Sequence, residues 1–506
     1  MPYEILGVFG IFTVVSLIFY SLTPEKYRHI TLLATSLLAV LYLAKARIVF
    51  LLITIITTFF AGIIMDVIVS RNDTKGLEKA ERKKIKAKVK QQKKVVVFIY
   101  ILINLGILFI LKYLRLFMTP DALPPVLKIA LPLGISYYTL QSLSYVIDIF
   151  RGKYKAEKDI TKLALFVAFL PQLHEGPFGR YDQLMPEMCR NDRLKSSDIF
   201  AGVERILAGS FKIFMIANRA SIISDAVFNN YSSYNGIYVL VGGTAFLIQL
   251  YAEFSGYIDI ASGISKMFGI NFTENFDMPF ISRSVAEFWR RWHISLGSWF
   301  RDYVFYPVST SKWMKTITCR MNERAGDFIN ITTSLLIVWF LTGLWHGASL
   351  KYIVYGLYYF ALMIMINLLG PVCSKILEKY NLSANKGIAV LSVIKTQFFV
   401  LIGMIMFRAE NLTVFFNMMK HFVSSGPALP LFSFIEPADF AVLIISLGFV
   451  IMDTVLKLTD RNIAAKTTRI PAYLRYFICF SFALVIIVFG AYGPDYIPPD
   501  PVYGGF

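Results

Sequence analysis

The chain has 506 residues, of which 56% are hydrophobic and 17% charged, and its mean hydropathy is +0.58. Soluble domains are about half apolar, with about a quarter of their residues charged, so these values exclude an ordinary soluble protein and predict an all-α polytopic membrane protein. The net charge of +18 does not indicate nucleic-acid binding, because the basic residues cluster in short loops between apolar runs, as the positive-inside rule describes.

Three apolar runs open the chain, at residues 5–22, 30–44 and 48–70. The first run has neither a basic segment before it nor a small-residue cleavage site, so we expect a retained span rather than a signal peptide. The lysine-rich residues 71–94 follow and contain ERKKIKAKVKQQKK. The strongest basic loop is expected in the cytoplasm, which predicts an extracytoplasmic N-terminus. The same loop is also suited to anionic lipid headgroups.

A clear span at residues 95–114 precedes a span at 127–150 that Pro132 and Gly134 interrupt. Interrupted spans are tolerated where the freed backbone groups line a cavity or find neighbours. Residues 160–170 are too short to cross a membrane and lead into PQLHEGPFGRYDQL, for which we expect a re-entrant turn. His174, Glu175 and Arg180 lie in this segment, and a solvated loop is the simpler interpretation of them.

The rest of the chain continues the alternation of apolar runs and short polar segments, so we expect about 11–13 spans or re-entrant helices in total. The sequence has no internal repeat and no linker, which predicts a single integral membrane domain over residues 1–506. Within it we distinguish N-terminal spans (1–115), a core (125–370) and C-terminal spans (388–492). The later apolar runs are residues 206–223, 237–250, 331–345, 352–369, 388–407, 440–456 and 473–492.

Residues 249–307 form the most unusual stretch of the chain, because charged and aromatic side chains are crowded into apolar sequence. An apolar run with Glu253, Ser255, Tyr257 and Asp259 comes first, a loop with glycine and asparagine follows, and EFWRRWHISLGSWFRDYVFYP ends the stretch. We predict one helix over residues 286–301, with His293 on its apolar side. An interfacial anchor helix with a packed histidine and a helix with a functional histidine remain equally open.

His346 directly follows the apolar run at residues 331–345, and Gly343 and Gly347 flank it at GxxxG spacing. This spacing is typical of closely packed helices, in which case His346 is an ordinary helix-end residue. Alternatively, the missing side chains leave room for a ligand beside the imidazole, which can take a proton from a hydroxyl at neutral pH. Ionisable groups at membrane depth are costly and tend to line a pathway.

Other chemistries find no support in the sequence. It contains no GxxxxGK[ST], GxSxG or HExxH motif, and Cys189, Cys319, Cys373 and Cys479 are scattered without ligand spacing, so we expect no metal site and no bound cofactor. Direct transfer with a single base therefore fits better than a covalent intermediate on the enzyme. The basic side chains near His293 suit the phosphates of a donor such as coenzyme A, although each alone is more simply a positive-inside residue: Arg290, Arg291, Arg301 and Lys312.

Two histidine motifs, WHGAS around His346 and EFWRRWHISLGSWFRDYVFYP around His293, resemble the membrane-bound O-acyltransferase family. The longer motif is most similar to the branch that contains the membrane component of alginate O-acetylation. FSGYIDIASGISKMFG, NFDMPFISRS and PLGISYYTLQSLSYVIDIFRGK resemble the same branch. The resemblance is dense over residues 131–356 and looser over the whole chain.

The resemblance implies a helical shell around a transmembrane tunnel in a bacterial cytoplasmic membrane. It implies that His346 is the general base at the constriction and that His293 lines or supports the tunnel. It also implies acetyl-CoA as the cytoplasmic donor and an extracytoplasmic polysaccharide, or a partner acetyltransferase, as the acceptor. Further residues near these motifs are candidates for donor or substrate binding: Tyr257, Asp259, Arg290, Arg291, Trp292, Arg301 and Trp345.

One departure from the family pattern bears on the donor. After the RDY motif the family has YIPLGG, whereas this chain has Tyr306-Pro307-Val308-Ser309-Thr310. This loop is a candidate for docking the donor or the partner, so the identity of the donor follows less directly than the fold.

Two other functions stay open. The teichoic-acid D-alanylation relatives have the same histidine motifs but take their acyl group from a carrier protein. A transporter or flippase without chemistry would suit the broken span at Pro132 and the polar Glu253 and Asp259, although the sequence shows no inverted repeat.

Overall fold

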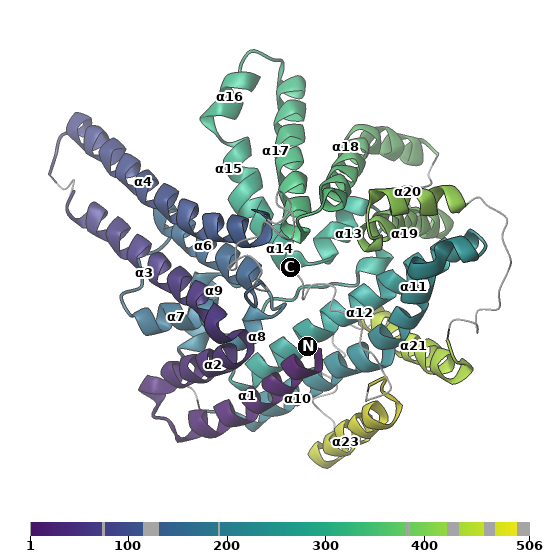
Figure 1. Ribbon diagram of the computed structural model, residues 1–506. Helices are drawn as coiled ribbons and strands as arrows, with labels where there is room; N and C mark the ends of the chain where they lie inside the picture. The colour runs from purple at the N-terminus through teal and green to yellow at the C-terminus, as the bar shows by residue number, and fades with distance from the viewer. Residues whose placement is uncertain are drawn as a thin grey trace. The chain divides into compact units, whose positions relative to one another are not determined.

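The computed structural model describes residues 2–72, 76–114, 131–190, 193–380, 382, 385–422, 435–459 and 471–492. Within these ranges the regular structure is helical apart from one isolated bridge between Phe276 and Trp292. Nine helical stretches in the described part are long and apolar enough to cross a membrane (Figure 1). The predicted all-α polytopic membrane fold is confirmed, and the predicted total of about 11–13 also counted re-entrant pieces too short for this criterion.

The chain divides into two compact units, Met1–Gly202 with Ile264–Thr273, and Val203–Gly263 with Glu274–Val502. The first unit holds the N-terminal helices and ends within α10. Its helices are α1 (Pro2–Leu22), α2 (Arg28–Ala44), α3 (Ile48–Ser70), α4 (Lys79–Lys112), α6 (Ile135–Arg151), α7 (Ile160–Ala168), α8 (Leu170–Leu173), α9 (Tyr181–Met188) and the first turns of α10 (Ser196–Phe211).

The lysine-rich segment does not form the predicted loop. Helix α4 begins at Lys79 and runs without a break to Lys112, so most of the basic segment is a helical extension of the span. Lysine, glutamine and alanine favour helix, and residues 79–94 contain no proline or glycine that would end it. Lys93 is buried, and its Nζ donates to the carbonyl oxygens of Ile149 at 2.8 Å and Phe150 at 2.9 Å at the end of α6.

Hydrogen bonds between side chains of different helices hold the first unit together. Tyr100 Oη on α4 donates to Ser142 Oγ on α6 at 2.9 Å, and Ser16 Oγ on α1 donates to Thr35 Oγ1 on α2 at 2.9 Å. All four side chains are buried. Lipid offers no hydrophobic force between helices, so interhelical polar contacts of this kind contribute to association.

Residues 171–178 of the PQLHEGPFGRYDQL segment are buried, so the interpretation as a solvated loop is wrong for His174 and Glu175, which are 4% and 2% exposed. Arg180 is partly exposed. Helix α8 forms its first part, and Glu175 turns the chain with a φ of 59°. Gln172 Nε2 donates to the carbonyl oxygen of Pro177 at 2.8 Å, which closes the turn. Gly134 allows close approach, because a Cβ there would clash with the backbone carbonyl of Leu173.

The second unit contains residues 249–263 and 274–307 of the stretch singled out in the sequence, together with the C-terminal spans, and α12 belongs to it as far as Gly263. Its helices are the rest of α10, α11 (Asn218–Asn230), α12 (Ile237–Met267), α13 (Val285–Arg291), α14 (Ile294–Phe300), α15 (Tyr306–Ser309), α16 (Lys312–Thr318), α17 (Glu323–His346), α18 (Leu350–Lys379), α19 (Lys386–Arg408), α20 (Leu412–His421), α21 (Pro437–Thr459) and α23 (Ala472–Phe489). Two π-helical segments interrupt this order, Lys212–Ala217 after α10 and Arg301–Phe305 after α14. Such segments occur often at functional sites.

Helices α17 and α18 pack backbone to backbone. A Cβ on Gly343 would clash with the carbonyl of Tyr352, and a Cβ on Gly356 would clash with the carbonyl of Trp339. At Gly347 a Cβ would lie 2.6 Å from the ring of Tyr352. The GxxxG spacing therefore serves close packing at the end of α17, and the alternative of an opening beside His346 is not needed to explain these glycines.

Candidate active site

Helix α13 begins with a reciprocal cap. Ser284 Oγ accepts the backbone N–H of Glu287 at 3.1 Å, and the Glu287 carboxylate accepts the backbone N–H of Arg283 at 2.9 Å. This is close to the capping box that S-x-x-E sequences form. Burial alone would raise the pKa of the Glu287 carboxyl, but the Arg283 N–H and the guanidinium of Arg291 outweigh it and hold that pKa below its usual value.

The single helix predicted over residues 286–301 is wrong, because the chain leaves the helix at Trp292 and starts a new one at Ile294. Trp292 is extended, and His293 takes a left-handed conformation with a φ of 47°. His293 therefore lies at the junction of α13 and α14 and not on a helix face. Non-glycine residues adopt this conformation rarely, and histidine is among the more tolerant types.

The break has a long-range cause in the loop after α12. The backbone of Asp277 donates to the carbonyl of Arg291 at 2.9 Å, and Ile294 donates to the carbonyl of Asn275 at 3.0 Å. These bonds pair the loop with residues 291–294 and replace the hydrogen bonds that a continuous helix would make. Asn275, which is fully buried, completes the arrangement by accepting the N–H of Ser295 on its Oδ1 at 2.9 Å.

Asn275 also fixes the imidazole of His293. Its Oδ1 lies 3.3 Å from Nδ1 of His293. Since Oδ1 already accepts the Ser295 N–H, the orientation of the amide is settled, and the oxygen can only accept from the ring. The proton of neutral His293 therefore belongs on Nδ1, and Nε2 carries the lone pair.

Burial keeps this imidazole neutral. His293 is 4% exposed, and burial lowers its pKa from 6.5 to about 3. The ring of Phe254 meets it edge-on, with centroids 4.8 Å apart. A neutral imidazole with a defined tautomer can accept a hydrogen bond or a proton through Nε2.

Trp345 lies against both histidines that the sequence singled out. Its ring centroid is 5.9 Å from that of His293 and 4.9 Å from that of His346. His346 is the last residue of α17 and is 3% exposed. The two imidazoles, distant in the sequence, thus belong to one buried aromatic cluster of the second unit. Whether they face one continuous passage stays a prediction.

Two further aromatic side chains lie edge-on to His346. The ring of Phe407 lies edge-on to it with centroids 5.1 Å apart, and that of Tyr355 with centroids 5.7 Å apart. Lys351 secures Phe407, because its Nζ donates to the carbonyl oxygens of Phe407 at 3.1 Å and Ala409 at 2.7 Å. Residues from α17, α18 and α19 therefore enclose one imidazole.

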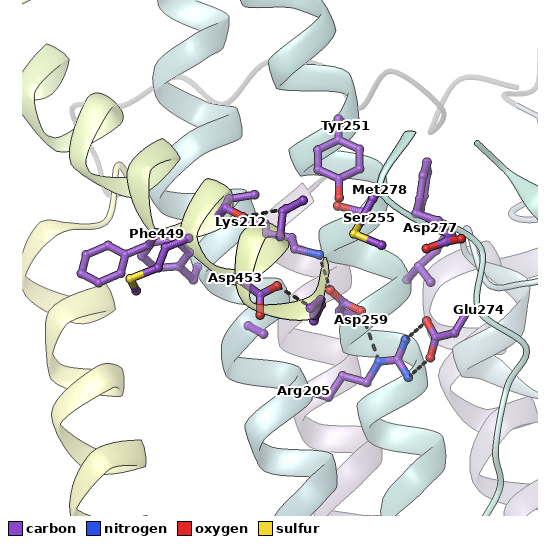
Figure 2. A pocket seen from close by; sticks show the side chains of 18 of the residues that line it. Arg205, Lys212, Tyr251, Ser255, Asp259, Glu274, Asp277, Met278, Phe449 and Asp453 are labelled. Atoms are coloured by element: carbon purple, nitrogen blue, oxygen red, sulfur yellow. Dashed lines mark hydrogen bonds and ion pairs between the residues drawn. The ribbon is translucent and has the colours of Figure 1, made fainter. Parts of the chain in front are cut away.

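A cavity of about 760 Å³ lies elsewhere in the same unit (Figure 2). Asp259 lines it and binds two cations, Lys212 through Nζ at 2.6 Å and Arg205 through Nε at 3.2 Å. Arg205 also forms a bidentate pair with Glu274 at 2.8 and 2.6 Å. Neither histidine lines this cavity, but Asn275, which holds His293, does.

The structure places the other sequence candidates in four different surroundings. Trp345 joins the two histidines, and Asp259 lies in the charged network of the cavity. Trp292 and Tyr257 are buried, with Trp292 stacked on Phe288 at 5.3 Å in a packed aromatic core.

The three arginine candidates lie at the surface. Arg290 and Arg301 are exposed, and Arg291 is paired with Glu287 at 3.0 Å and Asp277 at 3.3 Å. Arg301 is paired with Asp302 at 3.0 Å. These positions are open to an anionic donor, but each guanidinium with a carboxylate partner would have to exchange it.

Sequence reasoning missed Asn275, Arg205 and the pairing of Lys212 with Asp259. A signal for the pair was present, because each charge interrupts an apolar run, and opposite charges at membrane depth tend to pair. Asn275 gave no such signal, since an asparagine in a loop is ordinarily a turn residue.

Comparison with known proteins places these residues in context. A sequence model described as the membrane-bound O-acyltransferase family matches residues 157–321, which include His293 but end before His346. The chain is 36% identical over 302 residues to the probable alginate O-acetylase AlgI of Pseudomonas aeruginosa, covering 59% of this chain and 52% of that protein. It is 31% identical over 293 residues to the teichoic acid D-alanyltransferase of Bacillus subtilis, covering 55% of this chain and 69% of that protein.

A third relative is the peptidoglycan O-acetyltransferase of Helicobacter pylori, with 27% identity over 351 residues and 63% of each chain covered. The matched segment spans only about half the length of the Pseudomonas aeruginosa protein, 52%. The names of the three relatives describe acetylation of alginate or peptidoglycan, or D-alanyl transfer to teichoic acid.

Proposed function

This chain belongs to the membrane-bound O-acyltransferase family, and from that premise we propose that it is a membrane O-acetyltransferase. It takes the acetyl group of cytoplasmic acetyl-CoA and passes it to a hydroxyl of an extracytoplasmic polysaccharide, directly or through a partner acetyltransferase. The location is a bacterial cytoplasmic membrane, with the N-terminus on the extracytoplasmic side. The chain is a multi-pass membrane protein, which suits a reaction whose donor and acceptor lie on opposite sides.

One observation carries this proposal. His293 and His346 lie in one buried cluster, and each is a neighbour of the Trp345 ring. A transfer between a donor and an acceptor on opposite sides of a membrane needs a base away from bulk water, where it takes the proton of the acceptor hydroxyl. Two buried imidazoles in contact with one indole ring supply that chemistry.

In the proposed reaction His346 is the general base. It takes the proton of the acceptor hydroxyl while the oxygen attacks the carbonyl carbon of the thioester, the carbon–sulfur bond breaks, and the proton passes to the departing thiolate. His293, held by Asn275 with Nε2 unprotonated, accepts a hydrogen bond from the acceptor or the donor and orients it. No covalent intermediate on the enzyme is required.

D-Alanyl transfer from a carrier protein is the second candidate, and the similarity to the Bacillus subtilis enzyme over 69% of its length favours keeping it. Both candidates use the same histidines and differ in the donor. The purified protein, reconstituted in vesicles, is supplied with labelled acetyl-CoA or with a D-alanyl carrier, and label on an added glycan or partner is counted. Transfer from acetyl-CoA alone supports O-acetylation, whereas transfer only from the carrier overturns it.

His346→Ala separates an enzyme from a transporter in the same assay. An acyltransferase loses transfer although the variant inserts and elutes as the wild type does. Undiminished transfer by this variant would remove His346 from the role of base.

A further inference from the structure

The charged cavity of the second unit has no part in the proposed reaction, and its construction points to a ligand. One side consists of the network of Arg205, Lys212, Asp259 and Glu274, and Phe449 lies across from it (Figure 2). Further apolar side chains of α21 and α23 complete that second side: Val450, Met452, Leu456 and Phe482. The cavity is therefore amphipathic.

The apolar side is built from helices that the rest of the chain hardly covers. In the described part, only 11% of the α21 span and 6% of the α23 span are buried. Both helices are apolar enough to cross a membrane, so acyl chains of the bilayer reach the edge of the cavity. Phe449 and Met452 are exposed at 54% and 50% and present the surface on which an acyl chain can lie.

The polar side lies within a span but close to its end. Asp259 precedes the last residue of α12 by eight positions, which corresponds to about 12 Å of helix. Asp453 and Lys457 lie in the last turns of α21 and form an exposed ion pair at 2.6 Å. Ionisable groups within a span are costly unless they serve a ligand or each other, and the ends of the spans lie nearest the lipid headgroups.

Two residues that line the cavity carry buried polar groups outside the ion pairs. Ser255 and Asn275 are 3% and 0% exposed, and Ser255 Oγ and Asn275 Nδ2 have no hydrogen-bond partner among the described residues. Buried polar groups are nearly always paired, so each of these two orphan donors requires an acceptor from outside the described part of the chain. Phosphate and ester oxygens of a lipid are acceptors of this kind.

The charge balance selects the headgroup. The cavity is lined by three cations, Arg205, Lys212 and Lys457, and four carboxylates, Asp259, Glu274, Asp277 and Asp453. Arg291 outside the lining pairs with Asp277 at 3.3 Å, so cations and carboxylates are equal in number and a purely anionic headgroup would find no excess of positive charge. A zwitterionic headgroup has a partner for charges of both signs: its phosphate lies toward Arg205 and Lys212, and its ammonium lies toward Asp453.

We propose that this cavity is a binding site for a membrane phospholipid with a zwitterionic, ammonium-bearing headgroup. The phosphate lies near Arg205 and Lys212, the orphan donors hold phosphate or ester oxygens, and the ammonium lies near Asp453. One acyl chain runs along Phe449 and Met452 into the bilayer. Because Asn275 lies in both places, the bound lipid contacts the residue that positions His293.

Lipid binding to the delipidated full chain tests this proposal without any assay of transfer. Native mass spectrometry counts the adducts with a phosphatidylethanolamine, with a phosphatidylglycerol of the same acyl chains, and with glycerophosphoethanolamine, which has no chains. We expect one retained phosphatidylethanolamine, at least about tenfold preferred over the anionic lipid, and no retained chain-free headgroup. Preference for phosphatidylglycerol, or equal retention of both lipids, overturns the zwitterionic site.

Two variants test whether the lipid binds in this cavity. Asp453→Lys removes, at an exposed position, the carboxylate proposed to lie near the ammonium. Met452→Trp fills the exposed apolar side and leaves every charged residue unchanged. Each should lower retention of phosphatidylethanolamine at least about fivefold, with elution and thermal midpoint unchanged. Glu378→Lys, a matched exposed reversal near the end of α18, should leave retention as in the wild type. Unchanged retention in both cavity variants contradicts the proposal.

Discussion

Asn275 holds His293 by its side-chain oxygen, which lies 3.3 Å from Nδ1 of the imidazole and accepts the backbone N–H of Ser295 at 2.9 Å. One buried amide therefore fixes both the start of α14 and the tautomer of a candidate active-site histidine. The remaining ring nitrogen, Nε2, is the one with a lone pair. The geometry makes Asn275 a positioning residue whose effect can be separated from that of the histidine.

Replacing Asn275 tests this relationship. Asn275→Ala removes the acceptor for Nδ1 and for the Ser295 N–H, and we expect transfer to fall by about 10²-fold because the imidazole is no longer held in place. Asn275→Asp keeps the acceptor and adds a negative charge that favours the imidazolium. It should retain more activity than the alanine variant at alkaline pH, with its acid-side loss of rate displaced to higher pH.

The control is Asn271→Ala, which removes an exposed loop asparagine whose side chain bonds Glu187 at 3.2 Å. It should transfer as the wild type does. Equal pH profiles for Asn275→Asp and the wild type would mean that the amide does not act through the imidazole.

Much of the fold follows from the sequence, because apolar runs of span length leave a helix as the only way to satisfy the backbone in lipid. The break at Trp292 and His293 does not follow, because no proline or glycine marks it between Val285 and Leu296. Local periodicity favours one helix there. The pairing with Asn275 and Asp277, which lie in a separate loop, overrides that preference.

The residues of the candidate site likewise fall into those that the sequence indicated and those that it did not. Histidines inside apolar sequence were visible as candidates, and so was Trp345 beside one of them. The partners that define their chemistry were not, since Asn275 and Phe407 reach them only through the fold. The single helix predicted over residues 286–301 placed the imidazole on a helix face for the same reason.

The stability of the protein should depend on pH through His293. Burial lowers its pKa from 6.5 to about 3, so the unfolded chain binds a proton near pH 6.5 that the folded chain binds only near pH 3. The free energy of unfolding therefore falls as the pH drops below about 6.5. Thermal midpoints in detergent should decrease between about pH 7.5 and 5.

The comparison variant is His293→Asn, since asparagine tolerates the left-handed conformation found here. Its midpoint should fall less over the same pH range than that of the wild type. The fall in the midpoint that remains in this variant comes from other groups, among them His174, whose pKa is lowered by burial to about 4. An identical pH dependence in both proteins would contradict a buried, neutral His293.

Lys351 should stabilise the surroundings of His346. Its Nζ donates to the carbonyls of Phe407 and Ala409 at the end of α19, and Lys351→Met leaves those carbonyls without this donor. We expect a loss of about 1–3 kcal/mol in unfolding free energy and a lower transfer rate. Lys395→Met, at an exposed position of α19, should change neither the unfolding free energy nor the transfer rate. Equal effects of the two variants would assign no special role to Lys351.

Close packing of α17 on α18 should be sensitive to one methyl group. Gly343→Ala places a Cβ against the carbonyl of Tyr352, so the helices must separate, at a cost of about 1–3 kcal/mol. Gly370→Ala, in α18 with no atom within 4 Å of the added Cβ, provides the matched control and should be neutral or slightly stabilising. Denaturation of both variants under identical conditions measures the difference, and equal midpoints would refute the packing role.

The central claim is that His293 and His346 serve one transfer reaction, and the rate of acetyl transfer in a double variant tests it most directly. We expect His346→Ala to lower the rate by about 10²–10⁴-fold, His293→Asn to lower it less, and the double variant to be no slower than His346→Ala, because residues that act as a unit are not additive. Losses that multiply in the double variant, or a full rate in either single variant, would contradict the account.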